Sequence, residues 1–260
     1  MADVPFRAAE VAALLVLGVT SPLAAQIDYR NLDDHRPTRV EDAYPAERYA
    51  LELIAPYSLE RERGGRWLHA VDLEAEYGGV LNAQIGVAVP VAGATGEGWG
   101  LSGLRVFMLY NFNTEGPLLP AMSLRADVQL PVGSLADDHV RVTGKGILTR
   151  SWGRQRVHLN AGYSLGEDTA PAAVDHADLW WVGAALDHTL YRQSVLAVGE
   201  VFVEQTSRGV PVEVNATLGL RWQWRPTTVL DLGVGRGLRP GVGPELSLTI
   251  GLTNAFGLVP

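Results

Sequence analysis

The hydrophobic and polar residues of this chain alternate one by one over much of its length. At the C-terminal end, Glu245, Ser247, Thr249, Gly251 and Thr253 alternate with Leu246, Leu248, Ile250 and Leu252. A period of two places the two sets on opposite faces of a β-strand. The apolar set is almost free of charge, whereas the polar set elsewhere in the chain carries Arg, Lys, Asp and Glu. This pattern is typical of a barrel with lipid outside and a polar interior.

The alternation predicts an all-β chain, folded from residue 49 to 260 as a single closed antiparallel transmembrane β-barrel of about twelve strands. The expected strands are 49–60, 66–77, 81–91, 101–113, 118–131, 138–151, 154–165, 178–190, 194–205, 210–225, 227–236 and 243–256. Every second connection is short, as at 78–80, 152–154 and 225–227, and the others are longer and more polar, as at 92–100 and 166–178. Outer-membrane barrels show this asymmetry, with short periplasmic turns and longer external loops.

The apolar face of the expected strands carries no charge. It comprises Leu51, Leu53, Val71, Leu73, Ile85, Val87, Val89, Leu104, Val106, Met108, Met122, Leu124, Ala126, Val128, Val157, Leu159, Val182, Leu186, Val201, Val203, Leu218, Leu220, Leu230 and Leu232. Because an Arg or Lys at the bilayer midplane costs roughly 2–4 kcal/mol, the absence of charge favours contact with lipid. The alternative is a soluble β-barrel or sandwich whose apolar face points inward and binds a small apolar ligand.

Aromatic residues gather at the ends of the strands that are joined by short turns. We expect a membrane-interface girdle of Tyr49, Tyr77, Tyr110, Phe112, Trp222, Trp224 and Phe256. Amphipathic rings favour the boundary between membrane and water, and transmembrane barrels carry girdles of them there.

The charges of the polar face divide into two groups along the chain. A basic wall of the lumen is expected from Arg105, Arg125, Arg141, Lys145, Arg156 and His158, and an acidic wall from Glu52, Asp72, Glu74, Glu76, Asp231 and Glu245. Closure makes the last strand a neighbour of the first, so the acids form one arc and the basic strands lie opposite. Two interpretations stay open: ion pairs that bridge and partly fill a narrow lumen, or a transverse field across a wet pore.

The N-terminal part of the chain precedes the barrel. Residues 11–19 form an apolar run that is followed by Thr20, Ser21 and Pro22, which predicts a signal peptide over 1–25 with cleavage after Ala25. A buried N-terminal helix is the alternative. Residues 26–48 show neither strand nor helix periodicity, which predicts an irregular periplasmic arm or plug. Its charges of both signs could pair with the charged walls of the lumen.

Composition narrows the classes further. The net charge of −8 argues against a nucleic-acid partner, and the absence of cysteine excludes disulfides and thiolate metal sites. No apolar run approaches the roughly 18 residues that a membrane-spanning helix needs. The histidines show no metal-ligand spacing. We therefore expect no metal and no cofactor.

A few polar residues that share one strand face are candidates for a catalytic site. His158 with Ser164 or Asn160 is the nearest candidate for a base with a nucleophile. No Gly-x-Ser-x-Gly element accompanies these residues. We interpret His158 as a polar wall residue and predict that the protein is not an enzyme.

Several stretches resemble the outer-membrane family of the MetA pathway of phenol degradation. The matching segments are Leu73-Glu74-Ala75-Glu76-Tyr77-Gly78 with 81–90, then 124–133 ending in Gln129-Leu130-Pro131-Val132-Gly133, then His158-Leu159-Asn160-Ala161-Gly162-Tyr163, and finally 231–237. The resemblance implies an outer-membrane barrel that takes up small compounds, including aromatic or hydrophobic ones. It supplies no catalytic motif.

Together these observations predict an outer-membrane channel or transporter for passive or facilitated passage of small molecules. The expected partners are the lipid bilayer of the outer membrane, a small-molecule solute and the barrel-insertion machinery. A barrel that transports nothing and serves as a structural or interaction protein is the alternative from another class.

Overall fold

The computed structural model describes residues 27–166, 179–191 and 194–258. The predicted signal peptide, cleavage site and N-terminal helix lie outside these residues, as does most of the predicted connection 166–178. Within the described part of the chain, no helix is long and apolar enough to cross a membrane.

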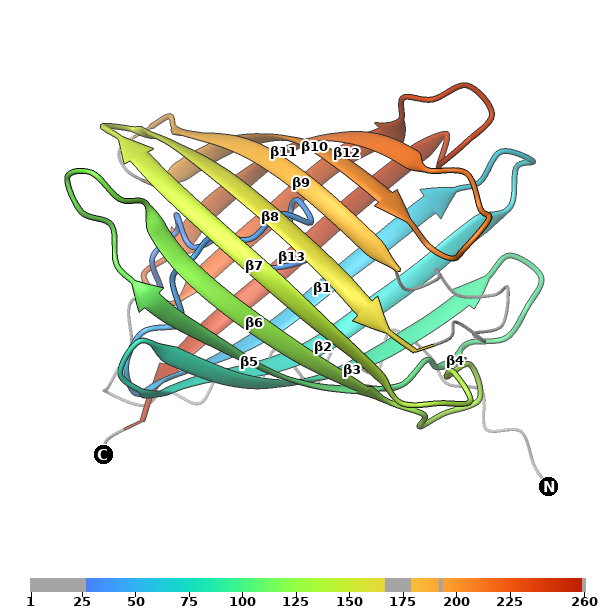
Figure 1. Cartoon of the computed structure of the whole chain (residues 1–260), viewed down its shortest axis with the longest axis horizontal. Helices are drawn as coiled ribbons and strands as arrows, with labels where there is room; N and C mark the ends of the chain where they lie inside the picture. The colour runs from blue at the N-terminus through green and yellow to red at the C-terminus, as the bar shows by residue number, and fades with distance from the viewer. Residues whose placement is uncertain (1–26, 167–178, 192–193, 259–260) are drawn as a thin grey trace.

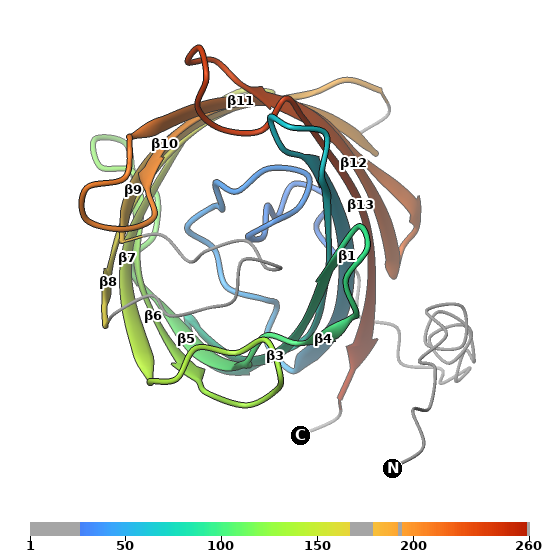
Figure 2. The ribbon, with the colours of Figure 1, turned by 90° about the vertical axis from the view of Figure 1, so that its right-hand side faces the viewer.

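The strands form one antiparallel sheet that closes on itself (Figures 1 and 2). They are β1 (Ala50–Arg61), β2 (Trp67–Val80), β3 (Ala83–Ala94), β4 (Gly100–Leu101), β5 (Leu104–Asn113), β6 (Ala121–Leu130), β7 (Arg141–Trp152), β8 (Gln155–Leu165), β9 (Trp180–Thr189), β10 (Val195–Gln205), β11 (Glu213–Arg225), β12 (Thr228–Gly237) and β13 (Leu246–Gly257). The sheet order is β2-β1-β13-β12-β11-β10-β9-β8-β7-β6-β5-β3-β4, and β2 also pairs with β3. The prediction of a closed antiparallel barrel is therefore confirmed.

One short strand was not predicted. The sequence suggested a continuous strand over 101–113, but the chain breaks at Ser102 and Gly103, and the two-residue β4 pairs separately with β3. Gly103 has a φ of 142°, in the left-handed region where glycine is favoured. A Cβ at this position would lie 1.9 Å from the side-chain amide of Gln129. The pattern of apolar residues does not predict such a break in the backbone pairing.

The connections differ in length between the two ends of the barrel. At one end, two-residue turns join β2 to β3, β7 to β8 and β11 to β12, and both Ala50 of β1 and Gly257 of β13 lie there. We call this the turn end. At the other end, which we call the loop end, longer segments such as 131–140 and 238–245 connect the strands. Figure 1 shows that the strands run obliquely between the two ends.

The side chains sort by face as the alternation predicted. Leu159, Leu186, Leu218 and Leu232 of the outer face are 47%, 52%, 69% and 56% exposed, while the intervening positions are buried or only partly exposed. Charges on the outward register lie near strand ends, as with Arg61 and Arg236. An apolar outer belt around a charged interior is incompatible with the soluble barrel or sandwich, because such a fold would bury its apolar face.

The aromatic side chains predicted for the girdle are located at the turn end. Tyr110, Phe112, Trp222 and Trp224 are about half exposed on the outer face. Tyr77 and Phe256 both pair with Leu51 in the register and are partly exposed. Tyr49 precedes β1 rather than lying within it, with a φ of 63° and its backbone N–H donated to the Gly78 carbonyl.

We predict that an outward charge in the middle of a strand destabilises the barrel. Leu232→Arg should lower the free energy of unfolding by about 2–4 kcal/mol, because the guanidinium would enter hydrocarbon. Unfolding in lipid vesicles measures the change. Leu118→Arg is the matched control, since Leu118 is 92% exposed in the 114–120 turn. Equal stability of the two variants would contradict the assignment of faces.

Candidate functional site

The segment that precedes β1 lies inside the barrel. We call residues 27–49 the arm; Figure 2 shows it, in blue, within the ring of strands. Ile27, Leu32, Val40 and Ala43 of the arm are buried. Leu32 and Val40 pack with Trp181, Leu196 and Phe202 of the wall, while Ala43 packs with Leu109, Ala121 and Ile147.

The arm is not part of the β-sheet. Side chains of the barrel wall form hydrogen bonds with its backbone N–H and C=O groups. Backbone N–H groups of Val40, Glu41, Ala43 and Ala46 donate to wall oxygens of Glu200, Asn160, Thr149 and Gln84 at 2.6, 2.9, 2.9 and 2.6 Å. The Ala43 carbonyl accepts from Asn111 Nδ2 and Ser123 Oγ at 2.7 and 2.5 Å. These partners come from strands distributed around the barrel, so the arm crosses the lumen instead of following one wall.

The wall is also shaped to admit the arm. Gly219 on β11 and Gly233 on β12 face Pro37, and a Cβ added to them would lie 2.6 Å from Pro37 Cγ and 2.5 Å from the Pro37 carbonyl oxygen. Any larger residue at these inward positions would displace the arm. The glycines therefore make the close approach possible.

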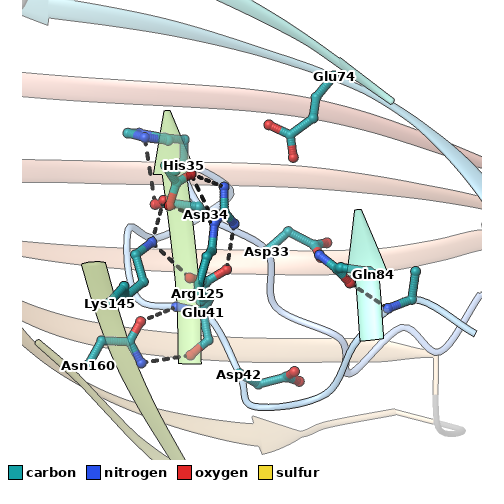
Figure 3. Close-up of polar contacts among 12 residues, drawn as sticks. Asp33, Asp34, His35, Glu41, Asp42, Glu74, Gln84, Arg125, Lys145 and Asn160 are labelled. Carbon is teal, nitrogen blue, oxygen red and sulfur yellow. Dashed lines mark hydrogen bonds and ion pairs between the residues drawn. The ribbon is translucent and has the colours of Figure 1, made fainter. Parts of the chain in front are cut away.

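Acids of the arm pair with bases of the wall (Figure 3). Lys145 Nζ lies 2.6 Å from Asp34 Oδ2 and 2.8 Å from Glu41 Oε1. Arg125 Nη1 lies 2.8 Å from Glu41 Oε2, and Arg156 Nη1 lies 2.9 Å from Asp42 Oδ2. Arg125, Lys145 and Arg156 are almost fully buried, so these acids supply much of the compensation that buried cations need.

Bases of the arm pair with acids of the wall. Arg36, which is fully buried, has Nη1 3.6 Å from Asp231 Oδ2 and a second ion pair with Asp33 of the arm itself. Arg39 forms an ion pair with Glu204 of β10, and its guanidinium carbon lies 4.1 Å from the centre of the Phe202 ring. The arm therefore offers each side of the lumen the opposite sign of charge.

Burial and nearby charge act on the ionisable groups of the arm. Burial raises the pKa of Glu41 above its ordinary value, although Arg125 and Lys145 act in the other direction. Burial would also raise the pKa of Asp34, but His35, Lys145, Arg125 and Arg105 outweigh it and hold that pKa well below its ordinary value. Asp34 is consequently ionised at neutral pH.

His35 is neutral at the same pH. The carboxylate of Asp34 favours the imidazolium, but the enclosure of the half-exposed ring within the lumen and the charges of Arg105, Arg39 and Lys145 outweigh it and lower the pKa of His35 to about 4. Lys145 is therefore the cation that balances Asp34 at neutral pH.

The structure places most of the predicted lumen residues on the inner face. Arg125, Arg141, Lys145, Arg156, His158, Glu52, Glu74, Glu76 and Asp231 are buried, while Arg105 and Asp72 are partly buried. Glu245 was placed wrongly: β13 begins at Leu246, and the Glu245 side chain is 41% exposed at the loop end, 3.5 Å from Arg61. The alternation of polar and apolar residues extends to Glu245, one residue before the strand begins. In the loop this alternation does not predict which way a side chain points.

The two charged walls are less separate than the sequence suggested. Arg105 Nη2 on β5 lies 2.5 Å from Asp72 Oδ2 and 3.0 Å from Glu74 Oε2 on β2, with only β3 between the strands. On the acidic side, Arg221 of β11 lies 3.7 Å from Asp231. Charges on nearby strands thus neutralise one another locally, and the order of the residues along the chain does not predict these pairs.

Three cavities adjoin the arm. Two lie at the loop end: the β7-side cavity of about 260 Å³, bordered by Asp34, Arg105, Arg141 and Lys145, and the β10-side cavity of about 120 Å³, bordered by Glu60, Glu200, Glu204, Glu213 and Arg39. The turn-end cavity, of about 330 Å³, is bordered by Asp42, Tyr44, Glu52 and Arg156. The arm contributes residues to all three and lies between the cavities of the two ends.

The predicted catalytic candidates do not meet. His158 Nδ1 lies 3.0 Å from Thr149 Oγ1 and Nε2 lies 3.0 Å from Asp187 Oδ2, whereas Ser164 bonds Thr143 and Asn160 bonds the arm. Thr149, His158 and Asp187 are each at most 1% exposed, and Ala43 N–H already donates to the Thr149 hydroxyl. Among the described residues, no group of three or more side chains could hold a metal ion.

The wall groups that hold the arm were not predicted from the sequence. Gln84, Asn111, Thr149 and Glu200 each bond its backbone. Their shared signal was a polar side chain on the inward register of a strand.

Comparison with known proteins identifies the family. The model of the family described as "Putative MetA-pathway of phenol degradation" matches residues 50–243. The chain belongs to this family. None of the curated proteins matches the chain in sequence.

Solved structures show the same fold at low sequence identity. The COG4313 outer membrane channel from Pseudomonas putida F1 is 13% identical, with a TM-score of 0.62 over 83% of this chain and 98% of that one. The KdgM porin in complex with disordered oligogalacturonate is 11% identical, with a TM-score of 0.54 over 79% and 99%. The NanC porin is 10% identical, with a TM-score of 0.54 over 78% and 98%. This member of the MetA-pathway family accordingly shares the closed antiparallel β-barrel fold of these proteins.

We predict that Glu41 is needed to dock the arm. Glu41→Gln leaves Arg125 and Lys145 buried with fewer charged partners, and breaking a buried ion pair costs about 3–5 kcal/mol. Amide hydrogen exchange at Val40, Glu41 and Ala43 should accelerate by at least about tenfold. Glu62→Gln is the control, because the Glu62 side chain is 43% exposed and lies 3.7 Å from Arg66. Unchanged exchange in both variants would show that these ion pairs do not retain the arm.

Proposed function

We propose that the barrel carries small molecules across the outer membrane through the loop-end cavities and past the arm. The single observation that supports this route is a charged, cavity-bearing interior inside an apolar outer wall. In this proposal the loop end faces the exterior and the turn end, with the arm attached, faces the periplasm. Residues 27–49 then act as a plug that narrows the path, and the basic and acidic lumen residues set its selectivity.

The class of solute is inferred from the family. Its description refers to phenol degradation, which favours small aromatic or hydrophobic compounds. The cations that border the β7-side cavity each have an acidic partner, as with Arg105 and Asp72 or Arg141 and Asp137. Among the described residues that border this cavity, each cation is balanced by an acid, and this balance supports a neutral solute over a strongly anionic one.

Permeation tests the proposal directly. Proteoliposomes should swell in a panel of phenols and short aliphatic acids faster than empty liposomes do. Deletion of 26–45 should raise the single-channel conductance, since the arm occupies the lumen. Unchanged conductance after the deletion would contradict the plug, and no permeation of any solute by either form would defeat the channel.

We also propose that the protein is not an enzyme. The Thr149, His158 and Asp187 arrangement is buried beneath the arm, and a substrate would have to replace Ala43 there. We expect no turnover of p-nitrophenyl esters by the purified protein. An esterase activity that disappears in Thr149→Ala while the barrel remains folded would overturn this expectation.

A further inference from the structure

The two loop-end cavities differ in the charges that border them. Around the β7-side cavity, acids and bases are mixed: Asp34, Asp72, Asp127 and Asp137 stand with Arg39, Arg105, Arg141 and Lys145. Around the β10-side cavity, four acids stand with one Arg, which is Arg39. The arm therefore places an acid beside the wall that carries Lys145 and a base beside the wall that carries Glu204.

Asp34 and Arg39 are more exposed to water than the wall residues with which they pair. The side chains of Asp34 and Arg39 are 14% and 30% exposed, whereas their partners Lys145 and Glu204 are 3% and 6% exposed. Within each of these two ion pairs, an ion in the cavity thus meets the arm group before the more deeply buried wall charge of opposite sign. Removing the arm charge would leave the field of the wall partner in surplus.

We propose that Asp34 and Arg39 set the charge selectivity of the path, with opposite signs. Asp34 offsets Lys145 and restrains anions from accumulating in the β7-side cavity. Arg39 offsets Glu204 and its acidic neighbours and restrains cations from accumulating in the β10-side cavity. Selectivity is then a property of the arm as much as of the wall. The inference rests on the proposed channel function and adds the residues that decide which ions and charged solutes pass.

The size of the effect follows from Coulomb's law. A unit charge several ångströms from the path in water changes the energy of a passing ion by about RT before screening, and salt reduces this value. Because cations and anions respond in opposite directions, one neutralised side chain should change the cation-to-anion permeability ratio by about two- to fivefold.

Reversal potentials of the full-length protein in a KCl gradient across a planar bilayer test the proposal. Asp34→Asn should shift the permeability ratio toward chloride, and Arg39→Gln should shift it toward potassium. Asp34→Glu and Arg39→Lys keep the charges and should keep the wild-type ratio. Glu97→Gln is an external control, since Glu97 lies in the loop before β4 with a side chain 49% exposed.

The outcomes separate this proposal from the channel itself. Conducting variants whose ratios do not move, or move in the same direction, would overturn the role of the arm and leave the channel intact. A full-length protein that stays closed while the 26–45 deletion conducts would overturn it as well, because ions would then never pass the arm. If neither form conducts, the channel function fails and the selectivity proposal with it.

Discussion

Hydrocarbon on the outside of the wall forces the ionisable side chains of the strands inward. A charge at mid-membrane depth on the outer face is costly, and unpaired backbone groups are not tolerated there, so the sheet must close and its polar face must enclose an axis. The consequence is a lumen crowded with Arg, Lys, Asp and Glu. The groups inside the barrel must therefore compensate one another's charges.

Part of the compensation comes from other strands of the wall. Arg105 binds Asp72 and Glu74, and Arg156 binds Asp187. The rest comes from the arm, which supplies Glu41 to Arg125 and Lys145, Asp42 to Arg156, and Arg36 to Asp231. Each of these groups would be expensive to bury alone, so the arm and the wall stabilise each other. These contacts match the first interpretation suggested by the sequence, in which ion pairs fill much of the lumen. The second interpretation, a transverse field across a wet pore, stays a prediction.

The contacts between the arm and the wall affect both the stability of the barrel and the route through its lumen. The same contacts that hold the arm across the barrel separate the loop-end cavities from the turn-end cavity, so a solute of the proposed channel must pass beside the arm or displace it. Packing of Val40 against Trp181 and Phe202, and of Ala43 against Leu109 and Ile147, adds an apolar contribution that charge alone would not provide. A path through such a barrel is therefore set by a peptide segment as well as by strand side chains.

The sequence by itself determined the fold class, the faces and most strand positions, because period-two alternation is a local property that a bilayer enforces at every strand. It predicted that Arg125, Lys145 and Glu76 belong to the polar face. It missed the break at Gly103 and placed Glu245 on a strand, because backbone breaks and strand ends leave no mark in alternation. Only the tertiary structure decided which charges meet. The pairs Lys145 with Asp34 and Arg36 with Asp231 join residues far apart in the chain, through the path of an aperiodic arm. That path depends on the shape of the closed lumen, with Gly219 and Gly233 leaving room for Pro37, and no local pattern encodes it.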